Sequence, residues 1–390
     1  MVVDMGCSSR RRGIRIGGQA APLPGFSTWV IGLGLLLAAP SAMAQIVPGP
    51  GPGIQPPDFE AAGVAEEEDI QIEEATSETT RSATVRISTT ISTQVEYELR
   101  QRSSTSDDSA GGAGRRRAAQ GSFGGGSIAA WVNGGVTFLE NDTAGLEFDG
   151  ELYNPLTGMD YTLPDLGLVA GLAIGYERSD LDTTFGSGRL LGDGLVVSPY
   201  VGKTVGEHAI VDAGLGYARI GYSRTSTIDE VRSQGDFNGN RFFAFVNATG
   251  YLPDGIVEVD GLTILGKAGF RYSREEQDAF TQGTTRIDGR TVALGQLSLA
   301  GEVRYQPETD FEGIVEFFAR AEGNIDVIRN ETAVLPGFPE GSDDRTDVTL
   351  SLGAVARLTD SVSLDVTYEH VLSREDISEQ SLVAGLRINF

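Results

Sequence analysis

The sequence predicts an all-β protein, a twelve-stranded antiparallel transmembrane β-barrel. From residue 127 onward, segments of roughly ten residues with alternating apolar and polar side chains follow one another, as in membrane barrels. After a secretion signal at the amino terminus, no stretch of about 18 or more consecutive apolar residues occurs, so membrane-spanning helices are excluded and a barrel is the one structure that could span. The chain ends on an apolar ladder with a terminal phenylalanine.

The first segment, residues 1–44, has the three parts of a secretory signal peptide. An arginine-rich start precedes the apolar run WVIGLGLLLAA, which is too short for the roughly 20 residues of a spanning helix. Ala42 and Ala44 form an A-x-A cleavage site before Gln45. The single cysteine, Cys7, lies inside this segment, so the mature chain is expected to contain neither a disulfide nor a thiolate metal site.

Three segments of different composition separate the signal from the first strand. Residues 45–75 are rich in proline and glycine and then acidic, a composition that predicts disorder. Residues 76–102 contain SATVRISTTISTQVEYELR, whose β-branched residues alternate as in a strand. The stripe of Ile87, Ile91, Val95 and Leu99 in the same stretch also has helical i+4 spacing. Residues 103–126 are rich in serine and glycine and are expected to form a flexible linker.

Residues 127–390 form the predicted barrel. The connections after even-numbered strands are mostly short, such as LPD, VGEH and LTDSV. Those after odd-numbered strands are mostly long and polar, such as RSDLDTTFGSGRLLG and RTSTIDEVRSQGDFNGN. Because short turns belong on the periplasmic side, the start of the first strand and the end of the last strand are both expected to face the periplasm. The twelve strands are predicted in AAWVNGGVTFL, LEFDGELY to GMDYTL, LGLVAGLAIGYE, DGLVVSPYVGKTV, AIVDAGLGYARIGYS, RFFAFVNATGYL, LTILGKAGFRYS, TVALGQLSLAGEVRYQ, IVEFFARAEGNIDV, DVTLSLGAVARL, SLDVTYEHVL and SLVAGLRINF.

Charged residues of both signs recur on one face of the predicted strands. An arginine or lysine on the lipid side would cost roughly 2–4 kcal/mol at the midplane, so this face is expected to line a polar lumen. Hydration of the lumen is the simpler interpretation of these charges, and docking of a helix is the alternative. The candidate lumen residues are Lys267, Arg271, Glu302, Arg304, Glu316, Arg320, Arg357 and Arg387.

The last strand carries a second candidate site. Counting back from the terminal phenylalanine, alternate apolar residues fall on one face, and this pattern resembles the assembly signal of bacterial outer-membrane barrels. The residues of this candidate signal are Leu382, Ala384, Leu386, Ile388 and Phe390.

From about residue 124 to the end, the chain resembles the translocator domain of the autotransporters, the type V secretion proteins. The resemblance is carried by Trp131, by GMDYTL followed by LGLVAGLAIGYERSDLD, and by VSPYVGK, GLGYARIGYS and SLVAGLRINF. It implies a barrel crossed by a helix from the preceding segment, and insertion with the barrel-assembly machinery and periplasmic chaperones. A helix satisfies its own backbone inside a pore and a lone strand does not, so residues 76–102 are expected to be helical.

The expected function is that of an outer-membrane translocator that exposes its short amino-terminal segment at the cell surface. The alternative is a stand-alone outer-membrane pore or structural surface protein whose amino-terminal segment stays in the periplasm. Beyond the signal peptide the sequence contains neither the nucleophile motif GxSxG nor a cluster of residues with metal-ligand spacing. His208 is expected in an exposed turn and His370 on the lipid side near the outer rim, and neither position suggests catalysis. No enzyme activity, catalytic residue, cofactor or metal is therefore expected. The net charge of −25 argues against nucleic acid, and the expected partner is outer-membrane lipid around a monomeric barrel.

Overall fold

The computed structural model describes residues 61–107, 126–228, 230–253, 259–308, 313–329 and 345–390. The predicted signal peptide with its cleavage residues Ala42, Ala44 and Gln45 lies outside these described residues. The same is true of residues 45–60 and of most of the predicted linker, residues 108–125.

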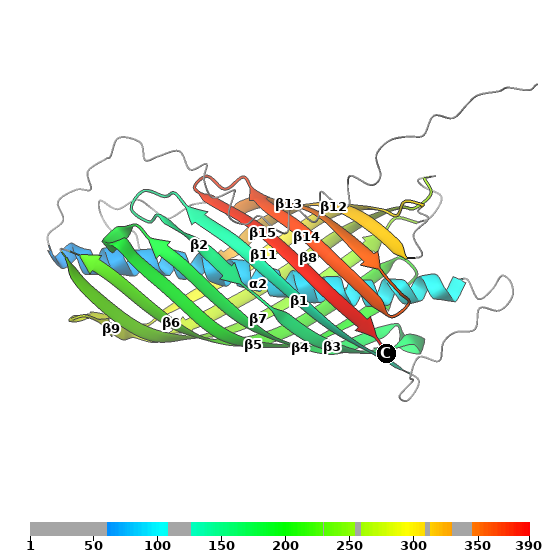
Figure 1. The fold of residues 1–390 in the computed structure, drawn as a ribbon, viewed down its shortest axis with the longest axis horizontal. Helices are drawn as coiled ribbons and strands as arrows, with labels where there is room; N and C mark the ends of the chain where they lie inside the picture. The colour runs from blue at the N-terminus through cyan, green and yellow to red at the C-terminus, as the bar shows by residue number, and fades with distance from the viewer. Residues whose placement is uncertain (1–60, 108–125, 229, 254–258, 309–312, 330–344) are drawn as a thin grey trace, which may run out of the picture. The chain divides into compact units, whose positions relative to one another are not determined.

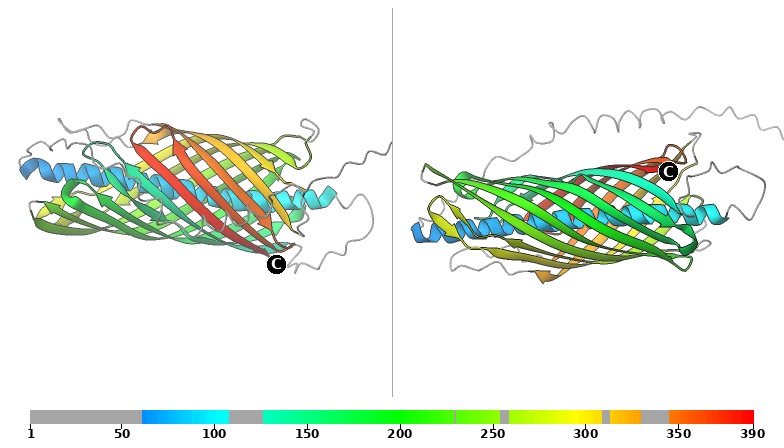
Figure 2. Two further views of the ribbon diagram at one scale, coloured as in Figure 1. Left: turned by 45° about the horizontal axis from the view of Figure 1, so that its top comes forward. Right: turned by 90° about the horizontal axis from the view of Figure 1, so that it is seen from below.

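A single antiparallel sheet closes on itself to form a barrel (Figure 1, Figure 2). Thirteen strands form the sheet, and β2 and β3 share one position between β1 and β4, so the barrel has twelve strand positions. The interruption falls at Asn154 and Pro155, where proline has no N–H to donate to the ladder. Pairing of β15 with β1 closes the barrel. The strands are β1 (Ser127–Asn141), β2 (Phe148–Tyr153), β3 (Leu156–Leu163), β4 (Leu168–Thr183), β5 (Gly188–Val205), β6 (Ala209–Ile228), β7 (Val231–Tyr251), β8 (Leu262–Gln277), β11 (Arg290–Tyr305), β12 (Ile314–Arg329), β13 (Thr346–Arg357), β14 (Val362–Leu372) and β15 (Ile377–Asn389).

Both ends of the barrel sequence lie at the same end of the barrel. The N–H of Phe390 donates to the carbonyl of Ile128 at 2.9 Å, which places the last residue beside the start of β1. We call this the terminal end and the opposite one the loop end. At the loop end a small hairpin of β9 (Phe280–Gln282) and β10 (Thr285–Ile287) lies between β8 and β11.

Two connections predicted as long polar loops at the loop end are instead strands, so that prediction is wrong. The pairing of β6 with β7 continues to Ile228 opposite Val231, and β4 and β5 pair up to Thr183 opposite Gly188. Only the short 3-10 helix η2 (Phe185–Ser187) links β4 to β5. Polar side chains are compatible with these longer strands, because the outward face of each strand is in water and the inward face is buried in the lumen. The hydrogen bonds between the paired strands satisfy the backbone N–H and C=O groups.

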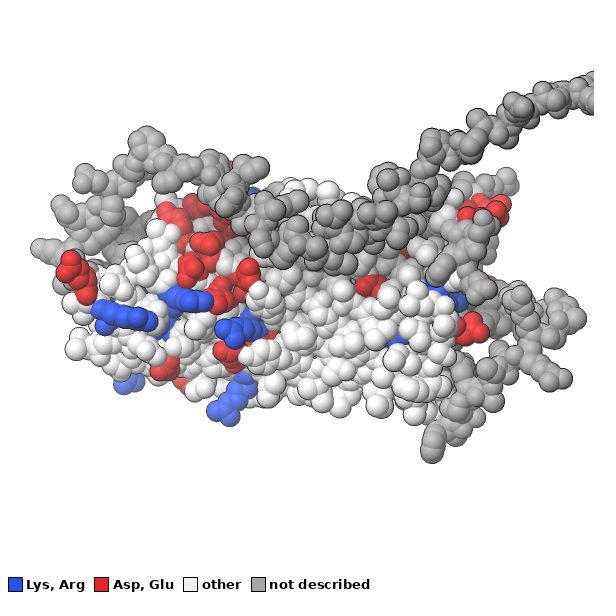
Figure 3. All heavy atoms as spheres, viewed as in Figure 1, with Lys and Arg blue, Asp and Glu red and all other residues white. Residues whose placement is uncertain are grey.

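On the face of the barrel seen in Figure 3, charged side chains gather toward the loop end and are sparse over the middle of the barrel. Large apolar side chains such as Leu195, Leu215 and Leu299 are strongly exposed on the outward faces. Exposed ion pairs, such as Arg189 with Asp180 at 2.6 Å, lie on the strands near the loop end. An outward-facing apolar band of this kind is the lipid-contacting surface of a membrane barrel.

A long helix, α2 (Ala61–Asp107), runs through the lumen. It confirms the predicted lumen helix, but it begins and ends outside the predicted bounds of 76–102. Residues 61–75 are helical and not disordered as expected, because Ile70, Ile72 and Ala75 are buried inside the barrel and this burial offsets the cost of ordering. No helix among the described residues has the length and apolar character needed to cross a membrane.

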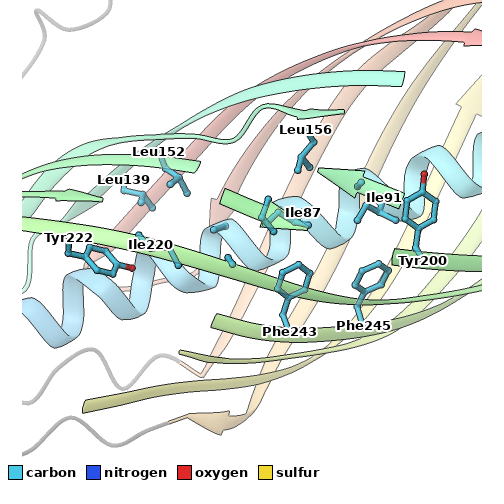
Figure 4. Close-up of a cluster of buried hydrophobic side chains, with 14 of the residues drawn as sticks. Ile87, Ile91, Leu139, Leu152, Leu156, Tyr200, Ile220, Tyr222, Phe243 and Phe245 are labelled. Atoms are coloured by element: carbon cyan, nitrogen blue, oxygen red, sulfur yellow. The ribbon is translucent and has the colours of Figure 1, made fainter. Parts of the chain in front are cut away.

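The buried apolar stripe of the helix shows that the i+4 spacing of this stretch, and not its strand-like alternation, reflects its structure. Ile87, Ile91, Val95 and Leu99 are all buried and belong to one hydrophobic cluster with side chains from β1 to β7. Figure 4 shows two of them, Ile87 and Ile91, among these barrel side chains. The barrel partners in the cluster include Trp131, Leu139, Leu152, Leu156, Tyr200, Ile220, Tyr222, Phe243 and Phe245.

Candidate functional site

The candidate site is the polar contact between α2 and the barrel wall. The apolar stripe packs mainly on β1 to β7, and many of the charged residues of α2 meet strands β8 and β11 to β15. Alternation in a strand points every second side chain inward, so each of these strands presents charged residues to the helix. We call the set of buried ion pairs between them the lumen network. Its helix members are Glu74, Glu78, Arg81, Arg86, Glu96, Glu98 and Arg100.

Near the terminal end, Glu96 is the centre of one cluster. Its carboxylate lies 2.7 Å from the Nζ atom of Lys267 and 3.1 Å from the guanidinium of Arg304. Arg304 also contacts Glu302, and the Nζ atom of Lys267 lies 3.2 Å from the carboxylate of Glu302. Glu316 accepts from Arg304 at 2.9 Å and from Arg100 of the helix at 2.6 Å. Every charge in this cluster therefore has a partner of opposite sign, as burial requires.

A second cluster lies where β15 meets β1. Arg387 is buried and contacts Glu98 of the helix at 2.7 Å and Asp160 of β3 at 2.6 Å. It also donates to the Oε1 atom of Gln94 at 3.1 Å. Asp160 in turn accepts a hydrogen bond from the hydroxyl of Tyr200.

The middle of the lumen holds a third cluster around Glu369. This residue of β14 accepts from Arg86 of the helix and from Arg320 of β12, each at 2.7 Å. Arg271 of β8 pairs with Glu322 of β12 at 2.8 Å, a contact within the barrel wall. The helix is thus held at this level by a shared carboxylate.

Ion pairs at the loop end involve residues that sequence analysis did not single out. Arg81 contacts Asp347 and lies 3.3 Å from Asp326. Arg374, in the turn between β14 and β15, donates to both oxygens of Glu78 at 2.6 and 2.8 Å. Burial opposes the charge of Arg374, but nearby Glu78 and Glu379 outweigh it and hold the pKa of the guanidinium above its ordinary value. Arg374 therefore stays charged at any pH the protein meets.

Arg241 is a fully buried residue that sequence analysis also missed. Its guanidinium lies 2.9 Å from Glu177 and 2.8 Å from Glu275, and it donates to the hydroxyl of Thr80 on the helix at 3.1 Å. The signal that could have found it is strand parity, because Arg241 alternates with Phe243 and Phe245, whose rings also face the lumen.

The eight predicted lumen residues occupy different positions in this network. Glu302, Glu316, Arg304 and Lys267 meet in the Glu96 cluster, and Arg387 lies in the cluster near β1. Arg320 and Arg271 pair with carboxylates of the wall. Arg357 lies partly exposed at the end of β13, and no carboxylate of the described residues is within ion-pair distance of it.

The residues of the predicted assembly signal lie on the outward face of β15. Leu382, Ile388 and Phe390 are exposed, and Ala384 and Leu386 share this face by alternation. The intervening residues Val383 and Arg387 are buried toward the lumen. This arrangement puts the apolar ladder in the lipid-facing belt.

With the helix in place, little free space remains in the lumen. A cavity of about 60 Å³ lies between α2 and strands β1, β8 and β11 to β15. It is lined by polar residues such as Thr90, Thr93 and Asp365. Since one water-sized sphere needs roughly 10–15 Å³, this cavity holds a few waters and no folded peptide.

Catalytic chemistry was sought in the same residues. Within the described ranges, no group of three or more histidine, cysteine, aspartate or glutamate side chains is arranged to hold a metal ion. His208 is exposed in the turn between β5 and β6, and His370 is partly buried on the outward face of β14. The lumen network described above binds helix α2 inside the barrel.

Comparison with known proteins identifies the architecture. Residues 130–369 match the family model described as the autotransporter beta-domain. The translocator domain of the autotransporter NalP from Neisseria meningitidis aligns with a TM-score of 0.56 and 16% identity over 77% of this chain and 98% of that one. The beta domain of the Bordetella autotransporter BrkA aligns with a TM-score of 0.55 and 15% identity, covering 68% of this chain and 100% of that one. No curated protein matches the sequence significantly.

Proposed function

Because this chain belongs to the autotransporter beta-domain family, we propose that it is a translocator that exposes its own amino-terminal segment at the cell surface. A closed barrel of this family with an apolar outer belt is an integral protein of the Gram-negative outer membrane. The finer proposal concerns the direction in which the chain passes through the lumen.

The direction of α2 carries this proposal. Gln71 donates to the carbonyl of Glu147 and Glu78 pairs with Arg374, both in connections at the loop end. Glu98 and Arg100 pair with Arg387 and Glu316, both close to the terminal end. The amino-terminal end of α2 therefore lies at the loop end of the barrel, and its carboxy-terminal end lies at the terminal end, where it leads to β1. If the terminal end faces the periplasm, the residues before Ala61 leave the barrel on the outside.

Assembly itself supplies the driving force in this proposal. The lumen network and the hydrophobic cluster are complete only when α2 occupies the lumen, so folding favours the state in which the helix has passed in. The outward ladder of Leu382, Leu386 and Phe390 is the segment that we propose the barrel-assembly machinery recognises, after periplasmic chaperones have delivered the chain. No nucleotide-binding loop of the type GxxxxGK[ST] occurs in the sequence.

The test is an epitope tag inserted directly before Phe59 in cells that produce the full chain. We expect antibody and protease to reach the tag on intact cells, because the helix starts at the loop end. A tag in the β9–β10 turn at Gly283 serves as the surface control, and a tag at Glu207 in the β5–β6 turn serves as the periplasmic control.

The outcome at Phe59 is judged against these two controls. Accessibility equal to that of Gly283 supports surface exposure. Accessibility equal to that of Glu207, gained only after the outer membrane is permeabilised, overturns the proposal. The chain would then be a stand-alone barrel with its amino-terminal segment in the periplasm.

A further inference from the structure

The sequence Tyr-x-Arg recurs on three strands of the barrel. In each copy the tyrosine and the arginine are two residues apart, so both side chains share one face of the strand. The residue between them is buried toward the lumen in every copy, so the tyrosine and the arginine face outward. We call these six residues the Tyr-x-Arg band: Tyr176 and Arg178 on β4, Tyr217 and Arg219 on β6, and Tyr272 and Arg274 on β8.

The three arginines lie at similar heights on the barrel. Their strands all begin at the terminal end, and Arg178, Arg219 and Arg274 follow the first residue of their strands by ten, ten and twelve positions. A transmembrane β-strand needs about 9–11 residues to cross the hydrocarbon layer. The arginines therefore lie where these strands leave the membrane toward the loop end. The tyrosines lie just inside this boundary, at the level of the aromatic girdle of a membrane barrel.

The arginines are evenly spaced around this sector of the wall. They occupy alternate strands of the sheet, and neighbouring strands lie about 4.8 Å apart, so consecutive arginines are roughly 10 Å apart across the sheet. On the strands between them, Asp193 is opposite Arg178 and Asn240 is opposite Arg219. One phosphate cannot reach two arginines at this spacing, so the band can contact more than one phosphate group.

Two of the three arginines have no counter-ion from the protein. Arg178 and Arg219 are exposed, and no carboxylate of the described residues lies within ion-pair distance of either. Asp193, the carboxylate opposite Arg178, accepts a hydrogen bond from the hydroxyl of Tyr176. Arg274 pairs with Glu276 at 3.0 Å, but both side chains are exposed, and such a pair contributes little. The band therefore presents guanidinium groups that can bind an anion from outside the chain.

The position of the band identifies the kind of anion. An arginine at the edge of an apolar surface lays its aliphatic stem along that surface and keeps its charged head at the level of the lipid headgroups. Its fork of N–H donors matches the oxygens of a phosphate. Exposed apolar residues such as Leu195 and Leu215 lie on the same outward face of the adjoining wall. A lipid phosphate contacts the arginines while its acyl chains contact this wall, whereas dissolved phosphate contacts the arginines alone.

The adjacent sector of the wall is acidic and limits the extent of the site. Glu140 is opposite Asp149, and Asp149 is opposite Asp182, so three carboxylates form one outward row across β1, β2 and β4. Like charges repel, so a phosphate is disfavoured beside this row. The anion-binding surface is thus confined to the sector from β4 to β8.

We propose that the Tyr-x-Arg band is a binding site for phosphate-bearing lipid in the leaflet that surrounds the loop end. Lipid phosphates bind Arg178 and Arg219, with Arg274 at the edge of the site, and the tyrosine rings pack against the same lipid molecules. The site lies on the outer wall and does not involve α2 or the residues before Ala61. Its test and the tag experiment therefore fail independently.

The experiment counts bound lipid by native mass spectrometry of the full chain folded in detergent. One probe is dioleoyl phosphatidic acid, whose headgroup is a phosphate monoester. The second is dioleoyl phosphatidylcholine, which has the same acyl chains and no net charge. Inorganic phosphate is added as a competitor and separates lipid binding from ion binding. Heat-modifiable mobility first shows that each variant is folded.

The test variant combines Arg178→Gln with Arg219→Gln, which removes two exposed charges without breaking an ion pair of the described residues. The matched control combines Arg189→Gln with Arg232→Gln, which removes two exposed arginines that lie closer to the loop end, at the second residues of β5 and β7. We expect the test variant to lower the apparent affinity for phosphatidic acid at least about tenfold and the control to change it less than about twofold. Arg178→Lys with Arg219→Lys keeps both charges and should retain most of the affinity.

The two double glutamine variants decide the outcome. A loss of affinity in the test variant, with little change in the control, supports the lipid site. An equal loss in both variants overturns it, because general attraction between opposite charges would then explain the binding, and so does an unchanged affinity in the test variant. Binding of phosphatidylcholine as tight as that of phosphatidic acid, or displacement of the lipid by an equal concentration of inorganic phosphate, also overturns it.

Discussion

Buried charge is the main feature of this protein at the scale of the residue. Arginine side chains such as Arg241, Arg320 and Arg387 lie inside the barrel among carboxylates. A buried ion pair contributes little net stability compared with an apolar pair of the same shape, but breaking one is costly because the other charge stays behind. These residues therefore specify which surfaces of helix and barrel meet.

Arg241 provides the sharpest test of this argument. Arg241→Ala leaves Glu177 and Glu275 buried without their shared cation, and we expect the free energy of unfolding to fall by about 3–5 kcal/mol. Urea unfolding of the barrel in detergent, followed by its heat-modifiable mobility, measures the change. Arg274→Ala is the control on the neighbouring strand, because Arg274 is exposed and pairs with exposed Glu276. We expect less than about 1 kcal/mol there, and similar losses in both variants would contradict the argument.

Strand parity predicted which charged residues point inward, but it did not predict their partners. Lys267 and Arg304 could be placed on the lumen face because they alternate with apolar residues. Their common partner, Glu96, lies far away in the sequence and on a helix whose rotation in the lumen sets the contact. A pairing between two separate elements depends on their relative position, and no local pattern contains that information.

Local propensity and tertiary context conflict at the scale of the element. The β-branched residues of 83–99 favour a strand, yet this stretch forms the centre of α2. In the lumen a helix satisfies its own backbone and places Ile87, Ile91 and Val95 on one buried stripe, whereas a strand there would have no neighbour to pair with. The environment therefore overrides propensity.

Removal of the helix gives the second prediction. With α2 in place the cavity beside the helix has a volume of only about 60 Å³, so we expect the full chain to conduct poorly in a planar bilayer. Deletion of residues 61–107 should raise the single-channel conductance several-fold, because it leaves a lumen lined by charged and polar side chains. Heat-modifiable mobility first checks that the shortened barrel is folded. A folded, closed barrel with unchanged low conductance would contradict a helix that blocks the pore.

The whole molecule is organised by the boundary between lipid and water. Outward apolar side chains form the belt. On the face seen in Figure 3 most of the charged side chains lie toward the loop end, with fewer at the terminal end. β6 and β7 extend beyond this belt as a paired hairpin up to Ile228 and Val231. Position relative to the belt, and not exposure alone, should therefore decide whether a charge is tolerated.

Two equally exposed positions test this statement. Leu299 on β11 is 71% exposed in the middle of its strand, and Val231 at the tip of β7 is 69% exposed. Leu299→Arg should destabilise the barrel in lipid vesicles by about 2–4 kcal/mol, and Val231→Arg by about 0–1 kcal/mol. Reversible unfolding from vesicles measures both. An equal cost at the two positions would show that the belt does not extend to Leu299 or does extend to the tip of β7.

The sequence alone was sufficient for the twelve-stranded barrel and for the inward face of the strands that carry the eight candidate charges, because these follow from residue periodicity. The lumen helix was expected from the resemblance to the autotransporters together with the need to satisfy the backbone inside a pore. The tertiary structure decided the rest. The helix begins before the predicted bound because Ile70, Ile72 and Ala75 are buried inside the barrel, and the polar segments around η2 and at the ends of β6 and β7 became strands because neighbours were available to pair with. The partners of Arg387, Arg241 and Glu96 depend on how the helix is rotated and translated in the lumen, a quantity that only the packing of all twelve strands around it determines.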